Sequence, residues 1–145
     1  MKLSPNAPCP CGASVKYKKC CRRYHAGGDA PTAGALMRSR YAAYAAGAAR
    51  YIMETTDPLG PQHEADEAAW RAGIEAFSRG TSFERLDVIE EADGASEDEA
   101  FVTFRAGLTQ RGQDASFVER SRFVRRDGRW LYHSGQPVAD PAPEG

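Results

Sequence analysis

Cysteine is absent from the last 124 residues of this 145-residue chain, and acidic residues are absent from its first 25. No apolar run approaches the roughly 20 residues that a membrane-spanning helix needs. The chain also lacks a P-loop, a Gly-x-Gly-x-x-Gly sequence, a His-Glu-x-x-His pair and a nucleophile elbow. These absences argue against a membrane protein, a nucleotide-binding enzyme of those types and a zinc protease. Because the N-terminus has no apolar signal-peptide region, we expect a cytoplasmic protein.

The four cysteines lie within thirteen residues, at Cys9, Cys11, Cys20 and Cys21. Two close pairs separated by eight residues can bring four thiolates onto one tetrahedral metal ion, for which zinc is suited and iron is the alternative. Disulfides are disfavoured, since disulfide scaffolds belong to cysteine-dense secreted domains. A closed shell of four thiolates predicts a structural metal site, with His25 outside the shell.

The cysteine segment is similar to a known motif. Residues 9–12 (Cys-Pro-Cys-Gly) and 16–21 (Lys-Tyr-Lys-Lys-Cys-Cys) closely resemble the SEC-C motif, which ends the translocation ATPase SecA and recurs in many bacterial proteins. Family members usually have Ser-Gly-Lys after the first glycine, where this chain has Ala-Ser-Val, but all four cysteine positions match. The resemblance implies a metal-binding knuckle that docks to a partner.

The remainder of the chain resembles a second family. Residues 31–44, 119–123 and 128–132 are similar to the YchJ-type family of bacterial proteins. That resemblance implies a SEC-C knuckle followed by a curved-sheet α+β domain of the nuclear transport factor two-like, or cystatin-like, kind. It implies no particular biochemical activity.

Hydrophobic periodicity gives the same fold class independently. Helical spacing over residues 33–52 is interrupted at Gly47, and a further helix is expected over 64–78 with Ala68, Trp70, Ile74 and Phe77 facing inward. Alternation then predicts strands over 83–91, 100–108, 117–124 and 130–133, with a type I′ turn at Asp127-Gly128. Helices followed by an antiparallel meander predict an α+β fold with the helices on one face of the sheet.

These patterns divide the chain into four parts. We expect a zinc-binding knuckle at 1–25, a linker at 26–32, the α+β body at 33–136 and a flexible tail at 137–145. Because the knuckle is too small for a core of its own, metal binding is expected to fold it. Removal of the metal is then expected to unfold the knuckle and leave the body folded.

Five residues of the body are candidates for a pocket: Glu119, Arg38, Arg40, Tyr41 and His133. Glu119 shares a strand face with Phe117 and Phe123, so an inward face would bury its carboxylate. A buried carboxylate needs a partner, and Arg38 or Arg40 is expected to pair with it, either as a polar strut or as an acid–base site. His133 is either an edge histidine or a general base. Tyr41, with Tyr44 and Tyr51, packs in the core or lines an aromatic pocket.

Charge is segregated along the chain. Residues 1–25 carry a net charge of +6 and the remainder −7. The basic knuckle either balances its own thiolates or attracts RNA or an acidic protein surface. A second basic run extends from Arg120 to Arg129 and is either solvated or a contact surface. No base-stacking motif is present, so sequence-specific nucleic-acid recognition is not expected.

The leading interpretation is a cytoplasmic zinc-binding adaptor, monomeric or dimeric, whose knuckle docks to a protein or ribosomal partner. The alternative is a small-molecule enzyme or ligand-binding protein that uses a cavity in the body. The sequence assigns no catalytic residue. The alternative predicts a deep cavity with Glu119 or His133 at its wall.

Overall fold

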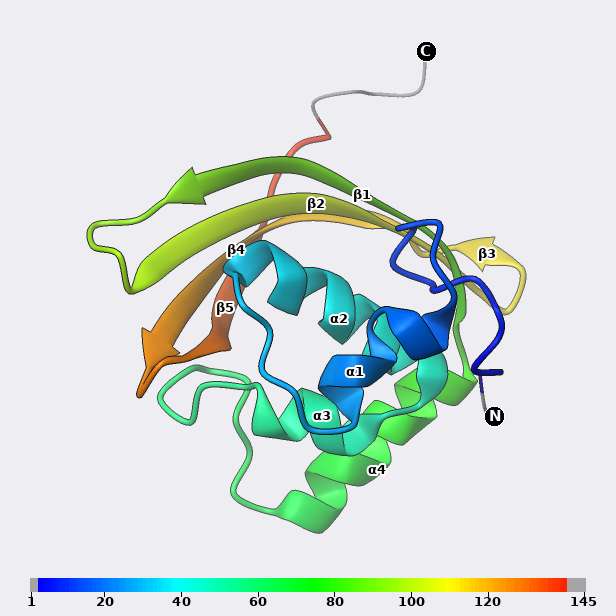
Figure 1. Cartoon of the computed structure of the whole chain (residues 1–145). Helices are drawn as coiled ribbons and strands as arrows, with labels where there is room; N and C mark the ends of the chain where they lie inside the picture. The colour runs from blue at the N-terminus through cyan, green and yellow to red at the C-terminus, as the bar shows by residue number, and fades with distance from the viewer. Residues whose placement is uncertain (1–2, 141–145) are drawn as a thin grey trace.

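One antiparallel sheet curves over the helices in the computed structural model, which describes residues 3–140 (Figure 1). Its strands follow the order β1-β2-β4-β5, and a short β3 pairs with β2. The bounds are β1 Ser82–Asp93, β2 Glu99–Gln110, β3 Gln113–Asp114, β4 Phe117–Arg126 and β5 Arg129–Pro137. The expected α+β meander is confirmed.

The helices all lie on the concave side of this sheet (Figure 1). They are α1 Arg22–His25, α2 Ala33–Ala46, α3 Ala49–Glu54 and α4 Glu67–Arg79, with a 3₁₀ turn η1 at Tyr17–Lys19. The Thr32 hydroxyl accepts a hydrogen bond from the Ala35 amide at 3.0 Å and begins α2. Gly47, with a left-handed φ of 74°, ends α2 and separates it from α3 as expected. Along residues 3–140, no helix is both long and apolar enough to cross a bilayer.

Helix α4 begins later than its pattern predicts. The Asp66 carboxylate accepts a hydrogen bond from the Ala69 amide at 3.1 Å, which fixes the start at Glu67. Trp70 and Ile74 are buried as expected. The prediction that Ala68 faces inward is wrong. Ala68 precedes the buried Trp70 by two residues, which is a rotation of about 200° around the helix, and its side chain is therefore exposed to solvent. Phe77 is partly exposed, with its ring against Tyr44.

The turns contain one confirmed and one missed feature. Asp127 and Gly128 have φ values of 52° and 79°, as the expected type I′ turn requires. A second such pair, Arg111 and Gly112 with φ values of 51° and 75°, leads into β3. The sequence did not reveal β3, because a strand of two residues has no periodicity. Of the expected tail, the Val138 amide donates to Val118 at 3.1 Å, and residues 141–145 lie outside the described residues.

The segment after α3 is tied to the last hairpin by a buried carboxylate. Asp57 is fully buried, and Arg126 Nη2 donates to its Oδ2 at 3.0 Å. The Leu59 amide donates to Asp57 Oδ1 at 3.0 Å. Burial alone would raise the pKa of Asp57, but the hydrogen bonds from Arg126 and Leu59 outweigh it and hold that pKa below its ordinary value. The Asp57–Arg126 contact therefore stabilises the fold while Asp57 is ionised.

We expect Arg126→Gln to lower the free energy of unfolding by about 2–3 kcal/mol at neutral pH, because it leaves the Asp57 charge buried without its partner. Arg50→Gln removes an exposed ion pair with Glu54 and should cost less than about 0.5 kcal/mol. Since the pKa of Asp57 is depressed in the folded state, its contribution is present above the ordinary carboxyl pKa and is lost as the pH falls through the folded value. Urea denaturation from pH 7 to pH 3 should show the Arg126→Gln deficit shrinking. Equal losses of unfolding free energy in Arg126→Gln and Arg50→Gln would contradict a stabilising role for the Asp57–Arg126 contact.

Candidate metal centre and ligand cavity

The four cysteine sulfurs converge at one point of the knuckle. All four Sγ atoms lie within 4.8 Å of one another, and Cys11 Sγ is 3.6 Å from Cys20 Sγ. All four are free thiols, three of them buried and Cys20 half-buried. A tetrahedral ion with metal–sulfur bonds of about 2.3 Å separates its sulfurs by about 3.8 Å. The donor set therefore fits one tetrahedral metal ion.

Local backbone structure positions the two cysteine pairs. The Cys9 amide donates to the Val15 carbonyl at 2.8 Å, which closes the first loop around Cys11. Gly12 follows with a φ of 84°, a conformation that glycine adopts without strain. The turn η1 then delivers the second pair, since the Cys20 amide donates to Tyr17 at 3.0 Å.

The thiols of this cluster cannot all ionise without a counter-charge. Hydrogen bonds from Cys11 and Cys21 lower the pKa of Cys9 to about 2. For Cys11 the hydrogen bond with Cys21 favours the thiolate, but donation to Cys9, burial and the charge on Cys9 outweigh it and raise the pKa to about 12. Hydrogen bonds to Cys11 and Cys9, together with burial, also raise the pKa of Cys21. A bound cation relieves this conflict, because it interacts with four deprotonated sulfurs.

His25 lies outside the sulfur cluster and joins the knuckle to α2. Its Nε2 lies 2.8 Å from the Ser39 carbonyl, and its Nδ1 lies 2.6 Å from the Tyr17 hydroxyl. Because a carbonyl only accepts, Nε2 carries the proton, and in the neutral ring Nδ1 accepts from Tyr17. The ring also packs against Tyr51 at 4.8 Å. The knuckle is therefore held to the body by directed contacts, to which Arg38 adds a hydrogen bond from Nη1 to the Cys11 carbonyl at 3.2 Å.

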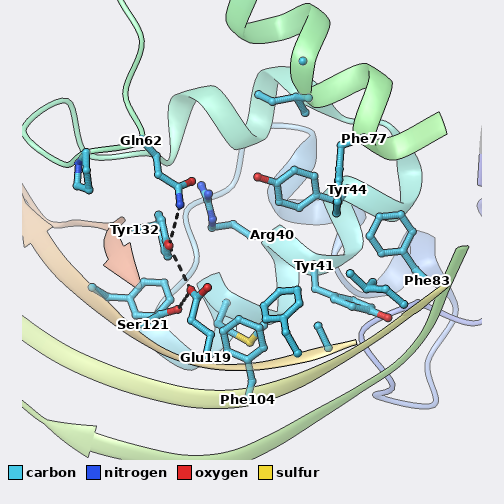
Figure 2. A pocket seen from close by; sticks show the side chains of 18 of the residues that line it. Arg40, Tyr41, Tyr44, Gln62, Phe77, Phe83, Phe104, Glu119, Ser121 and Tyr132 are labelled. Atoms are coloured by element: carbon cyan, nitrogen blue, oxygen red, sulfur yellow. Dashed lines mark hydrogen bonds between the residues drawn. The ribbon is translucent and has the colours of Figure 1, made fainter. Parts of the chain in front are cut away.

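A second site, a cavity of about 570 Å³, lies between the concave face of the sheet and helices α2 and α4 (Figure 2). Its volume falls within the range of ligand pockets, roughly 300–1,000 Å³. Most of its wall is apolar, and aromatic rings meet edge-to-face along it, as Tyr44 does with Phe77 at 5.4 Å. The aromatic lining residues are Tyr41, Tyr44, Trp70, Phe77, Phe83, Phe104, Phe117, Phe123 and Tyr132.

One end of the cavity is polar, and Glu119 is at its centre (Figure 2). Glu119 Oε2 accepts hydrogen bonds from the Ser121 hydroxyl at 2.5 Å and the Tyr132 hydroxyl at 3.2 Å. Gln62 Nε2 in turn donates to Tyr132 at 3.3 Å. Burial and the charge of Glu119 raise the pKa of Tyr132, so its hydroxyl remains a donor. The chain of hydrogen bonds therefore runs in one direction, from Gln62 through Tyr132 to Glu119.

Arg40 lies beside this network but does not pair with Glu119. It is 7% exposed, and its Nη1 donates to Ile52, Thr55 and Thr56 at 2.8–3.2 Å. Its guanidinium carbon lies 4.6 Å from the centre of the Tyr132 ring. Among residues 3–140, neither Arg38 nor Arg40 forms an ion pair within 4.0 Å. The expected Glu119–arginine pair is thus not formed, because Arg40 is directed to the end of α3 and Arg38 to the knuckle.

The other candidates divide between the cavity and its surroundings. Tyr41 lines the cavity while its hydroxyl donates to Arg85 in β1 at 3.0 Å. Tyr51 lies outside it, with its hydroxyl 2.7 Å from that of Ser39. His133 also lies outside. Tyr132 pairs with Phe123 and faces the cavity with it, and His133 follows as an extra residue at an irregularity in the β4–β5 register.

Several residues that line the cavity were not predicted from the sequence, among them Gln62, Glu64, Gly73 and Tyr132. Gln62 and Tyr132 carry no distinguishing pattern. Gly73 could have been noticed because it lies inside the helical pattern of α4, where a glycine often has a packing or functional reason. A Cβ atom placed at Gly73 would meet no atom within 4 Å, so the helix leaves open space there.

The arginine run of the last hairpin is largely neutralised. Arg122 pairs with Glu99 at 2.6 Å, Arg125 with Asp98 at 2.9 Å and Arg129 with Asp29 at 3.0 Å. The knuckle differs, because its basic side chains are exposed and form no ion pair within the part of the chain that the structure describes. These are Lys16, Lys18, Lys19, Arg22 and Arg23.

Comparison with known proteins assigns both parts of the chain. Residues 32–135 match the family model described as YchJ, middle NTF2-like domain, and residues 6–23 match the SEC-C motif. The chain belongs to the YchJ-like family. It is similar to UPF0225 protein SCO1677 of Streptomyces coelicolor, at 42% identity with 91% of this chain and 97% of the relative covered. It is 34% identical to UPF0225 protein Ent638_2310 of an Enterobacter species, with 88% and 81% covered.

Solved structures agree with this assignment. The YchJ-like chain is similar to the solution structure of RPA3114, a SEC-C motif containing protein from Rhodopseudomonas palustris. The TM-score is 0.75 at 33% identity, with 92% of this chain and all of the other covered. A SEC-C motif containing protein from Psychrobacter arcticus has the same fold, with a TM-score of 0.76 at 24% identity and 95% and 86% covered.

We expect this YchJ-like protein to contain about one metal ion per chain when it is purified without added metal, because four converging thiolates complete one tetrahedral shell. Cys20→Ser should lose most of that metal, while Ser14→Ala, a change at an exposed position of the same loop, should retain it. Elemental analysis identifies the metal, and native mass spectrometry gives the number of metal ions per chain. Equal metal content in the two variants would show that the cysteines are not the ligands.

Proposed function

We propose that the body of this YchJ-like protein binds a small, mainly apolar molecule in its cavity. The observation that supports this proposal is the aromatic cavity of about 570 Å³ with one polar end. The polar groups there are organised in advance, because Tyr132 and Ser121 donate to Glu119 and Gln62 donates to Tyr132. Such a combination of an apolar wall with a few fixed polar groups is typical of ligand sites.

Zinc is the metal that we propose for the knuckle, in a structural role. It suits four thiolates in tetrahedral geometry, and a closed shell leaves no position for a substrate. A cytoplasmic location fits this proposal, since reducing conditions keep the four cysteines available as ligands. Elemental analysis that returned iron would overturn the choice of zinc.

The knuckle supports a second candidate function, that of an adaptor. Its exposed basic side chains, unlike most arginines of the last hairpin, have no acidic partner in the described structure. We propose that they dock to an acidic protein surface or to a ribosome. This interaction would be electrostatic and would weaken with salt.

We expect Gly73→Leu to close the cavity without unfolding the protein. The new side chain enters open space at a lining position, and replacing glycine in a helix favours folding by about 0.5–1 kcal/mol. The probe is N-phenyl-1-naphthylamine, a neutral dye that fluoresces in apolar sites. Wild type should bind it saturably and 1:1, and Gly73→Leu should bind it at least tenfold more weakly.

Ala72→Leu is the matched control, since Ala72 is exposed on the same helix and does not line the cavity. It should leave dye binding unchanged. Thermal melting verifies that both variants are folded. Undiminished dye binding by Gly73→Leu, or none by wild type, would overturn the proposed function.

The adaptor proposal predicts that the triple change of Lys16, Lys18 and Lys19 to Gln weakens association with ribosomes. Three charges on the exposed surface are lost, while the four cysteines and the fold are untouched. Co-sedimentation at 50 and 300 mM salt measures the effect, and wild type should lose binding at the higher salt. A triple change of Arg50, Arg71 and Arg79 to Gln removes the same charge from the body and should leave co-sedimentation intact. Equal co-sedimentation of wild type and the knuckle variant would contradict a role for this surface.

A further inference from the structure

Arg40 has an unused hydrogen-bonding edge in the cavity. Within residues 3–140, all hydrogen bonds of its guanidinium leave from Nη1, and no acceptor is bound by Nε or Nη2. These two nitrogens form one edge of the planar group, with parallel N–H bonds suited to the two oxygens of a carboxylate. Because Arg40 lines the cavity, its free edge is available to a bound molecule.

The positive charge of Arg40 also has no carboxylate within 4.0 Å among residues 3–140. Arg40 is only 7% exposed. Its partners are a carbonyl, two hydroxyls and the face of the Tyr132 ring, all of which are formally neutral. Burying an unpaired charge is costly, so a position that retains one is typical of a functional site. Figure 2 shows the Tyr44 hydroxyl directed toward Arg40, which adds a second polar group to this part of the cavity.

From this geometry we propose that the cavity binds a monocarboxylate with an aromatic or other apolar body, whose carboxylate pairs with the Nε and Nη2 edge of Arg40. The aromatic wall encloses the body of the molecule, and Arg40 supplies its counter-charge. This inference rests on the proposed ligand-binding function and names the class of ligand.

The neighbouring Glu119 limits the ligand to a single negative charge. Both residues contact Tyr132, Arg40 at the ring face and Glu119 at the hydroxyl, so they lie at the same end of the cavity. A doubly charged phosphate would meet only one guanidinium and would be repelled by the Glu119 carboxylate. A monocarboxylate instead leaves the pair of side chains and the ligand with a total charge of −1.

The test uses three probes that share one aromatic body: 2-naphthylacetate, the isosteric 2-naphthylacetamide and the doubly charged 2-naphthylmethylphosphonate. Displacement of N-phenyl-1-naphthylamine from the full-length protein, with its metal as purified, gives the affinities. Wild type should bind the carboxylate at least tenfold more tightly than the amide or the phosphonate. In ¹⁵N spectra the carboxylate should shift the Nε–H signal of Arg40 and the indole signal of Trp70, whereas the amide should shift mainly that of Trp70.

Variants assign the preference to Arg40. Arg40→Gln should reduce the carboxylate-to-amide ratio to about one while leaving amide affinity within about twofold, and Arg71→Gln, on the outer surface of α4, should retain the ratio. Glu119→Gln should raise carboxylate affinity by removing a nearby like charge. If Arg40→Gln does not fold, the probe ratio in wild type and the Arg40 Nε–H shift still decide the question.

The outcomes separate this inference from the function on which it rests. Equal binding of carboxylate and amide with a shifted Trp70 signal would overturn the carboxylate proposal and leave the cavity as a ligand site. Tighter binding of the phosphonate would likewise overturn it in favour of a dianion. Failure of every probe, the dye included, to shift Trp70 would overturn the proposed function itself.

Discussion

The contact between the end of α3 and strand β5 is the constraint on which the polar end of the cavity depends. The Tyr132 amide donates to the Thr55 carbonyl, and the Asp57 amide donates back to Tyr132, each at 2.8 Å. This pairing holds Tyr132 over the cavity and places the hydroxyls of Thr55 and Thr56 against Arg40. The segment therefore fixes the positions of both the Arg40 guanidinium and Tyr132, whose ring contacts Arg40 and whose hydroxyl donates to Glu119.

Helix α2 links the two sites of the molecule because neighbouring residues serve different ones. Arg38 and the Ser39 carbonyl contact the knuckle, at Cys11 and His25, whereas the next residue, Arg40, lines the cavity. Successive residues are about 100° apart around a helix, so one turn presents both surfaces. The knuckle therefore also contacts the helix that carries Arg40. The body and the knuckle share a core, rather than being joined only through residues 26–32.

Features that depend on local spacing could be predicted from the sequence, and features that depend on tertiary direction could not. Cysteine spacing predicted the cluster, and alternation predicted the four long strands and placed Glu119 on one face with Phe117 and Phe123, all three of which line the cavity. The partner of Glu119 was mistaken, because the α2 pattern places Arg38 and Arg40 near the body without showing where their long side chains end. The extra residue at His133 was not predicted, because alternation does not show where a strand gains a residue and shifts the side chains that follow it.

The same register irregularity explains how the polar end can be so closely packed. It brings Gly135 opposite Ser121, beneath the Glu119 carboxylate. A Cβ atom at position 135 would lie 2.0 Å from Glu119 Oε2 and 2.8 Å from the Tyr132 hydroxyl. Any larger residue would therefore displace the carboxylate from its two donors, and only glycine permits this approach. Ser121, Tyr132 and Gly135 thus act as one unit that sets the direction of Glu119, while α3 independently sets that of Arg40. Two separately anchored, oppositely charged groups that do not neutralise each other leave both able to interact with a bound molecule.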